Sequence, residues 1–284
     1  MNRRKFLRSS SSVAVSSVLL PWRHFTYAAI PSLPPAGADG WVSLLNGRDL
    51  NGWYSVLSKS GKGVAEQRGM VTIEENMLHI MGNPAGQSET EAGYLATTQD
   101  FENVRIRVEY KWGVKRFAPR AFSKRDNGLL YGLVGPDKVW PTSVECQIEE
   151  GDVGDAFMLG TRGIQDQHPN GLFGQNLTTH GWDIPPMPAP ETNPPSGPSD
   201  ITTFRKIKDG NFENLDTWNV LEVLWQGDRA AHIVNGRAVN ALSKLEQPDP
   251  LNPGTFIPLT RGKIAVQFEY AEIWFRRMEV KALG

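Results

Sequence analysis

Short runs of β-branched and aromatic residues, separated by Gly, Asn, Asp and Pro, restrict the fold of this sequence more than any other feature. The clearest run is 104–110, Val-Arg-Ile-Arg-Val-Glu-Tyr, in which apolar and charged residues alternate strictly. Such alternation is typical of an antiparallel strand with one face in a core and the other in solvent. Because similar runs recur from Trp41 to the C-terminus, the sequence predicts an all-β protein built as an antiparallel β-sandwich.

The same pattern predicts where individual strands and turns lie. Strands are expected at 71–73, 77–81, 94–97, 104–112, 128–134, 143–149, 157–163, 219–226, 229–234, 264–267 and 272–281. Hairpin turns are expected at Gln226–Arg229 and at Asn235-Gly236, since Asn and Gly accept the positive φ angles of a type I′ turn. The last strand keeps its alternation only if a bulge lies near Arg276-Arg277.

Composition narrows the class of protein. The chain has 284 residues, is 39% hydrophobic and contains nine Trp, so it can form a core without disulfides or metals. Its formal net charge is -1, which lacks the basic excess that nucleic-acid binding needs. The single cysteine, Cys146, has no partner for an internal disulfide and no neighbouring ligands at zinc spacing, so we expect a buried small apolar side chain.

The N-terminus has the pattern of an export signal. Paired arginines at Arg3-Arg4 precede a short Ser/Ala/Val/Leu run and a small-residue site at Ala28-Ala29, which predicts a twin-arginine signal over 1–29. We expect a linker at 30–40, one β-sandwich domain over 41–284 with a Pro-rich loop at 182–200, and no membrane span after signal removal. The expected location is periplasmic or secreted.

The segment 144–150, Val-Glu-Cys-Gln-Ile-Glu-Glu, is the most acidic strand of the sequence. On a strand, Glu145, Gln147 and Glu149 project from one face while Cys146 faces the other way. Alternation alone leaves two interpretations open, a solvated sheet face or a floor that binds sugar. A Gln between two Glu favours the second, because amides and carboxylates bind pairs of hydroxyls and paired acids act as acid and base.

Two further groups are candidates for a carbohydrate site. Asn127 and Tyr131 lie on the strand before the acidic one, and Trp140 directly precedes the acidic strand. Aromatic rings stack on pyranose faces and Asn supplies a donor and an acceptor, although Tyr131 and Trp140 are equally compatible with core or rim positions. Near the C-terminus, Gln267 and Glu269 are followed by Arg276, for which the alternatives are pairing with a carboxylate of the acidic strand or ordinary surface pairing. No serine-hydrolase, P-loop, dinucleotide or zinc-hydrolase motif is present in the sequence.

On these segments the chain resembles the 3-keto-disaccharide hydrolase family, long known only as a domain of unknown function. The opening 41–53, Trp-Val-Ser-Leu-Leu-Asn-Gly-Arg-Asp-Leu-Asn-Gly-Trp, looks like the family's Phe-x-x-Leu-Phe-Asn-Gly-Lys-x-Leu-x-Gly-Trp. The segments 127–130, 144–150, 218–219, 235–236, 262–267 and 273–276 match further motifs in order. Two departures are Glu150 in place of Asp and Glu269 in place of His.

The resemblance implies a concanavalin A-like lectin/glucanase sandwich of jelly-roll type that hydrolyses a glycoside already oxidised at C3. A ketone at C3 acidifies the C2 proton, so a carboxylate can remove it, the leaving group can depart by elimination, and water can add. By the resemblance, Glu145 or Glu150 is the base, and Gln147 and Asn127 hold hydroxyls. Arg276 polarises the carbonyl oxygen or orients a carboxylate, and a divalent cation on this carboxylate set is the alternative.

Two other functions compete with a keto-glycoside hydrolase: a non-catalytic carbohydrate-binding module and a conventional glycosidase. The latter needs two carboxyl groups about 5–5.5 Å or 6.5–9.5 Å apart. Residues i and i+4 on a strand, such as Glu145 and Glu149, have backbones roughly 13 Å apart. A binding module needs no carboxylate of perturbed pKa, so an enclosed carboxylate favours an enzyme.

Overall fold

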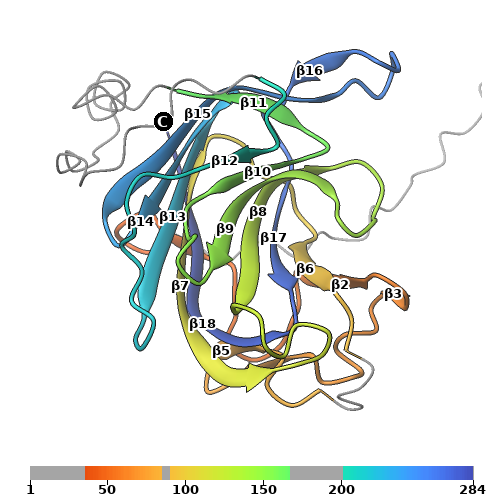
Figure 1. Ribbon diagram of the computed structural model, residues 1–284, viewed down its shortest axis with the longest axis vertical. Helices are drawn as coiled ribbons and strands as arrows, with labels where there is room; N and C mark the ends of the chain where they lie inside the picture. The colour runs from red at the N-terminus through yellow and green to blue at the C-terminus, as the bar shows by residue number, and fades with distance from the viewer. Residues whose placement is uncertain (1–35, 85–89, 167–200, 284) are drawn as a thin grey trace, which may run out of the picture. The chain divides into compact units, whose positions relative to one another are not determined.

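Two antiparallel β-sheets make up the fold, as Figure 1 shows for the computed structural model. The structure describes residues 36–84, 90–166 and 201–283. The predicted export signal at 1–29, part of the linker at 30–40 and the Pro-rich loop at 182–200 therefore lie outside the described residues. Within the described ranges no helix is long and apolar enough to cross a membrane.

One sheet has ten strands. Its main order is β11 (Arg162–Gln165), β15 (Arg237–Pro248), β14 (Arg229–Val234), β13 (Asn219–Gln226), β7 (Val104–Arg116), β18 (Ala271–Ala282), β5 (Met77–Ile80) and β4 (Val71–Glu74). The short strands β1 (Val42–Ser43) and β16 (Phe256–Pro258) pair with β18 and β15.

The other sheet has eight strands and carries the acidic segment. Its order is β12 (Arg205–Lys206), β10 (Ala156–Leu159), β9 (Thr142–Glu149), β8 (Asp126–Val134), β17 (Lys263–Phe268), β6 (Gly93–Thr97), β2 (Trp53–Leu57) and β3 (Gly61–Lys62). The acidic strand is β9, and it lies between β8 and β10 in this sheet (Figure 1).

Alternating apolar residues from both sheets form the core. Ile106 and Val108 of β7 lie in one cluster of buried residues with Val144 and Cys146 of β9, so these side chains face each other across the two layers. Packing one apolar face of each sheet against the other removes both from water, which is what a sandwich achieves. The predicted all-β sandwich is confirmed, and Cys146 is a free, buried thiol in its core.

Most predicted strands and both predicted turns are present. Asn235 and Gly236 have φ angles of 48° and 79°, and the register of β18 shifts between Phe275 and Arg277, where the bulge was expected. The single strand predicted at 157–163 is wrong, because Gly160 turns the chain with a φ of 65° and separates β10 from β11, which belong to different sheets.

Candidate active site

The outer face of the eight-stranded sheet bears the polar side chains of the acidic strand. Val144, Cys146 and Ile148 point into the core, so Glu145, Gln147 and Glu149 project from the opposite, outer face. This face is not solvated at its centre, because Glu145 and Gln147 are only 5% and 7% exposed. The interpretation of these residues as a solvated sheet face is therefore wrong.

A glycine on the neighbouring strand makes room for two of these polar side chains. A Cβ atom added at Gly128 of β8 would overlap Glu145 Oε1 and Gln267 Oε1, so both oxygens occupy the space that a larger residue would fill. Gln267 comes from β17 on the other side of β8. The missing side chain at Gly128 thus lets side chains from two flanking strands converge above the middle one.

Two buried oxygens at this place lack a hydrogen-bond partner among the described residues. They are Gln267 Oε1 and Asp126 Oδ1. Leaving a buried acceptor unpaired costs about 1–3 kcal/mol, and such groups are rare in folded proteins. Unpaired acceptors beside a buried carboxyl group are suited to a ligand that donates hydrogen bonds, such as one with hydroxyl groups.

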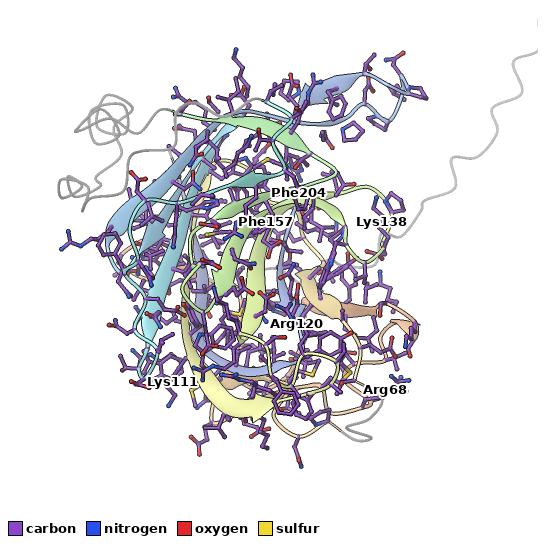
Figure 2. The ribbon with its side chains drawn as sticks, viewed as in Figure 1. Arg68, Lys111, Arg120, Lys138, Phe157 and Phe204 are labelled. Atoms are coloured by element: carbon purple, nitrogen blue, oxygen red, sulfur yellow. The ribbon has the colours of Figure 1, made fainter. Side chains whose placement is uncertain are left out.

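Arg120, in the connection between β7 and β8, bridges the carboxyl groups at one end of the site. Its Nη1 donates to Asp126 Oδ2 and to Glu269 Oε2, and its Nη2 lies 3.3 Å from Glu149 Oε1. Figure 2 shows Arg120 near the end of the sheet where β8 begins and β17 finishes. The Arg120 side chain is 28% exposed, against 7% for Asp126, so the cluster opens to solvent on the arginine side.

Burial shifts the pKa values of the carboxyl groups upward. Burial, then the charge of Asp126, raises the pKa of Glu145 to about 8. The same two causes raise the pKa of Glu269 to about 9 and that of Glu149 to about 7. Burial also raises the pKa of Asp126, although Arg120 opposes this shift. At neutral pH, Glu269 and most of Glu145 therefore hold their protons.

This arrangement provides a base and a polarising group in one place. A carboxylate with a pKa of about 8 is a stronger base than an exposed one and is partly ionised at neutral pH. The protonated Glu269 shares a hydrogen bond with Asp126, and the Arg120 guanidinium beside this pair can stabilise an oxyanion.

Two of the predicted substrate-binding residues have structural roles instead. Asn127 is fully buried, and its side chain donates to the Gln267 carbonyl and accepts from the Gly128 amide, which ties β8 to β17. Tyr131 lies in the core, with its hydroxyl 3.0 Å from His232 Nε2. Because the polar atoms of both side chains are already bonded inside the protein, the assignment of hydroxyl binding to Asn127 and of ring stacking to Tyr131 needs correction.

Glu150 and Arg276 also lie away from the cluster. Burial opposes ionisation of Glu150, yet hydrogen bonds from the Arg125 backbone and guanidinium lower its pKa, so it is a paired carboxylate and a poor base. Arg276 is on β18 in the ten-stranded sheet, where its Nε donates to Glu109 at 2.6 Å, and it does not pair with a carboxylate of the acidic strand.

The remaining predicted residues divide between the two ends of the site. Gln147 and Gln267 lie on the same outer face as Glu145, and Glu269 joins the arginine-bridged group. Trp140 is half-buried in the connection between β8 and β9, at the end of these strands far from Arg120.

Sequence reasoning missed Arg120 and Asp126. A signal for them exists in the charge pattern, because the segment 115–125 contains five basic residues and directly precedes the strand next to the acidic one. The two segments pair in the structure: Lys124 contacts Asp152 at 2.9 Å and Arg116 contacts Glu150 at 3.4 Å. The opposite charges of these neighbouring segments would therefore have predicted a basic side chain beside the carboxyl groups.

The carboxylate set does not have the arrangement of a cation site. Among the described residues, no group of three or more His, Cys, Asp or Glu side chains is placed to hold a metal ion. The centre of the cluster is occupied by the Arg120 guanidinium, which already binds Asp126, Glu149 and Glu269.

The fold and this site define an antiparallel β-sandwich with a polar site on one sheet. The model of the 3-keto-alpha-glucoside-1,2-lyase-like domain matches residues 40–281, and the chain belongs to this family. No curated protein sequence matches the chain. The resemblance noted in the sequence is thus confirmed over nearly the whole domain.

Solved structures with similar folds include enzyme-like and sugar-binding proteins. A candidate glycosyl hydrolase from Parabacteroides distasonis is 16% identical, with a TM-score of 0.48 over 87% of this chain and 95% of its own. A carbohydrate-binding module from Bacillus subtilis is 8% identical, with a TM-score of 0.45 over 81% of this chain and 96% of its own. At these identities the likeness concerns the fold alone.

Proposed function

We propose that the protein cleaves the glycosidic bond of a 3-keto-glycoside by removing the C2 proton. The observation that carries this proposal is the buried Glu145 carboxyl group, with its pKa of about 8, beside the unpaired Gln267 oxygen and near the cluster bridged by Arg120. Family membership supports the same chemistry.

In the proposed first step, the Glu145 carboxylate takes the proton from C2. The electrons of the C2–H bond form a C2–C3 double bond, and the ketone oxygen becomes an enolate oxygen. The positive charge of Arg120, which holds Glu269 and Asp126, stabilises the charge that develops on this oxygen. Replacing the usual His by Glu269 keeps a donor at this position as long as Glu269 holds its proton.

In the second step, the enolate collapses and expels the leaving group. The C1–O bond breaks, a C1–C2 double bond forms, the C3 ketone returns, and Glu145 passes its proton to the leaving oxygen. Water then adds across the C1–C2 double bond to give the free keto-sugar. The reaction consumes only the substrate and water. Arg120, in place of a divalent cation, is the proposed source of positive charge.

A conventional glycosidase receives less support from the geometry. Its two carboxyl groups stand on either side of the bond that they cleave. Here Asp126 and Glu269 accept hydrogen bonds from the same Arg120 nitrogen, so they lie side by side. A non-catalytic sugar-binding module does not require a buried carboxyl group whose pKa is strongly raised.

Aglycone release separates these functions. The mature chain is incubated with methyl 3-keto-glucoside and with unoxidised methyl glucoside, with and without a chelator, and released methanol is measured. We expect release from the keto-sugar alone, at a rate that the chelator does not change. Equal methanol release from both sugars would indicate a conventional glycosidase, and binding without release would indicate a binding module. Loss of release in the presence of chelator would show that a cation, and not Arg120, supplies the positive charge.

We also propose that residues 1–29 export the chain by the twin-arginine route, because of the Arg3-Arg4 pair and the apolar run after it. Fusing these residues to a folded reporter should deliver the reporter to the periplasm. Replacing both arginines by lysine should keep it in the cytoplasm, and delivery that is unaffected by this change would contradict the proposal.

A further inference from the structure

Glu145 lies at the boundary between a polar and an apolar half of the outer sheet face. Along β9 toward Arg120 it is followed by Gln147 and Glu149. Across the sheet it pairs directly with Leu130 of β8 and Phe157 of β10. Residues that pair directly in an antiparallel sheet share a face, with Cβ atoms about 4.5–5.5 Å apart.

Phe157 faces the same side as Glu145. Its neighbours Ala156 and Met158 belong to the core cluster between the sheets, so Phe157 and Leu159 project outward and are only partly buried. The ring of Phe157 is therefore an apolar surface directly beside the carboxyl group that the proposed reaction uses as its base.

A second aromatic ring extends this surface. Phe204, just before β12, packs edge-to-face against Phe157 with ring centroids 5.4 Å apart, and it is 55% exposed. Figure 2 shows both rings near the end of the sheet opposite to Arg120. Aromatic surface left in water costs about 25 cal/mol per Å², so an exposed ring beside a site is available for a ligand to cover.

Arg205 packs against the Phe157 ring of this pair. Its guanidinium lies 5.3 Å from the centroid of the Phe157 ring, while its Nε donates to the buried Asp155 at 2.6 Å. A ring that is held in place loses little conformational entropy when a ligand stacks on it.

We propose that Phe157 and Phe204 bind the leaving group of the substrate and that they select a leaving group with a flat apolar face, such as an aryl or benzyl aglycone. This inference rests on the proposed function. With C2 above Glu145 and the ketone toward Arg120, C1 and its substituent point toward Phe157, because C1 and C3 are on opposite sides of C2.

The chemistry of this half of the face favours an apolar aglycone over a second sugar. Phe157, Phe204 and Leu159 have no polar side-chain atoms, and the nearby Arg205 already donates to Asp155. The hydroxyl groups of a leaving sugar would find few partners there, and unpaired polar groups weaken binding.

The test compares benzyl and methyl 3-keto-glucosides, two alcohols of similar leaving ability, in wild type and in Phe204→Ala. Stacking on an aromatic ring contributes about 0.5–1.5 kcal/mol, which corresponds to a factor of about two to ten. We expect Phe204→Ala to lower kcat/KM by about fivefold for the benzyl substrate and to leave the methyl substrate within about twofold. Leu251→Ala, at an apolar residue 85% exposed in the turn between β15 and β16, is the matched control and should change neither.

The outcomes separate this inference from the proposed function. Equal loss on both substrates, or no loss on either, would overturn the role of the aromatic pair and leave the function standing. Cleavage of neither substrate by wild type would contradict the function. In that case calorimetric binding of benzyl and methyl glucoside still tests the surface, since tighter benzyl binding that Phe204→Ala removes would support it and equal binding would overturn it.

Discussion

The outer faces of the two sheets both carry alternating charged residues, but they neutralise them differently. On the ten-stranded sheet, two buried glutamates each have two arginine partners. Glu222 binds Arg105 and Arg107, while Glu109 binds Arg276 and Arg277. On the eight-stranded sheet, Asp126, Glu149 and Glu269 share the single Arg120, and the charge of Asp126 acts on the buried Glu145.

Arginines outnumber carboxylates in the first set, and a hollow of about 490 Å³ lies over it, lined in part by Arg107, Glu109 and Glu222. Carboxyl groups in excess raise one another's pKa in the second set, because burial and mutual repulsion both favour the protonated form. Alternating polar residues along a strand therefore identify a polar face, while the ratio of carboxyl groups to arginines on that face decides whether it can act as acid and base.

The most direct test of this difference between the two faces is to replace one glutamate on each face by glutamine. Glu145→Gln should lower kcat/KM on a 3-keto-glucoside by about a thousandfold, because an amide cannot remove a proton. Glu222→Gln should leave the rate within about twofold and reduce stability by about 1 kcal/mol through lost ion pairing. Steady-state rates and urea unfolding give both numbers, and an unchanged rate in Glu145→Gln would remove this residue from its role.

The arginines provide the second comparison. Arg120→Met should lower kcat/KM by about a hundredfold, since it removes the cation that stabilises the enolate oxygen and bridges three carboxyl groups. Arg276→Met should have an effect below about twofold, because Arg276 binds Glu109 on the other sheet. Greater damage from the Arg276 change than from the Arg120 change would reverse the assignment.

Two strand glycines test the space around the carboxyl groups. A Cβ at Gly128 would overlap Glu145 and Gln267, and a Cβ at Gly113 would overlap Glu272 in the other sheet. We expect Gly128→Ala to lower kcat/KM by about tenfold, because displaced catalytic groups lose alignment. Gly113→Ala should destabilise the fold with the rate unchanged, and equal kinetic effects would indicate a purely structural role for Gly128.

The last prediction concerns the pH dependence of stability. Glu145 has a pKa of 4.5 when unperturbed and about 8 in the folded protein, so between these values the folded state binds more protons than the unfolded state. The contribution of Glu145 to the free energy of unfolding is fully present below pH 4.5 and is lost as the pH rises through 8, by at most about 1.4 kcal/mol per pH unit. Urea unfolding from pH 5 to pH 9 should show a shallower decline in Glu145→Gln, and parallel declines would show that Glu145 ionises normally.

The sequence predicted the fold well, because strand alternation depends on local residues. The run 104–110 places Ile106 and Val108 in the core and Arg107 outside, as observed. The break between β10 and β11 was missed because Gly160 lies within an otherwise continuous apolar pattern, and its turn takes the chain from one sheet to the other.

The site was predicted only where its residues lie on one strand. Glu145 and Gln147 were found from alternation and family motifs together. Arg120 was missed because its contact with Glu269 joins segments that are far apart in the sequence. Arg276 was misplaced because a motif gives the order of residues along the chain without showing the sheet to which they belong. Tyr131 shows the same limit, since the aromatic residues of a core and of a binding surface look alike in sequence.

The most direct test of the account is the fate of the hydrogen at C2. Methyl 3-keto-glucoside deuterated at C2 is incubated with the purified protein, and the cleavage rate and the label in the keto-sugar product are measured. Removal of this proton by Glu145 predicts slower cleavage than with unlabelled substrate and loss of the label. Cleavage at the same rate with the deuterium still at C2 would contradict proton abstraction and with it the proposed role of the acidic strand.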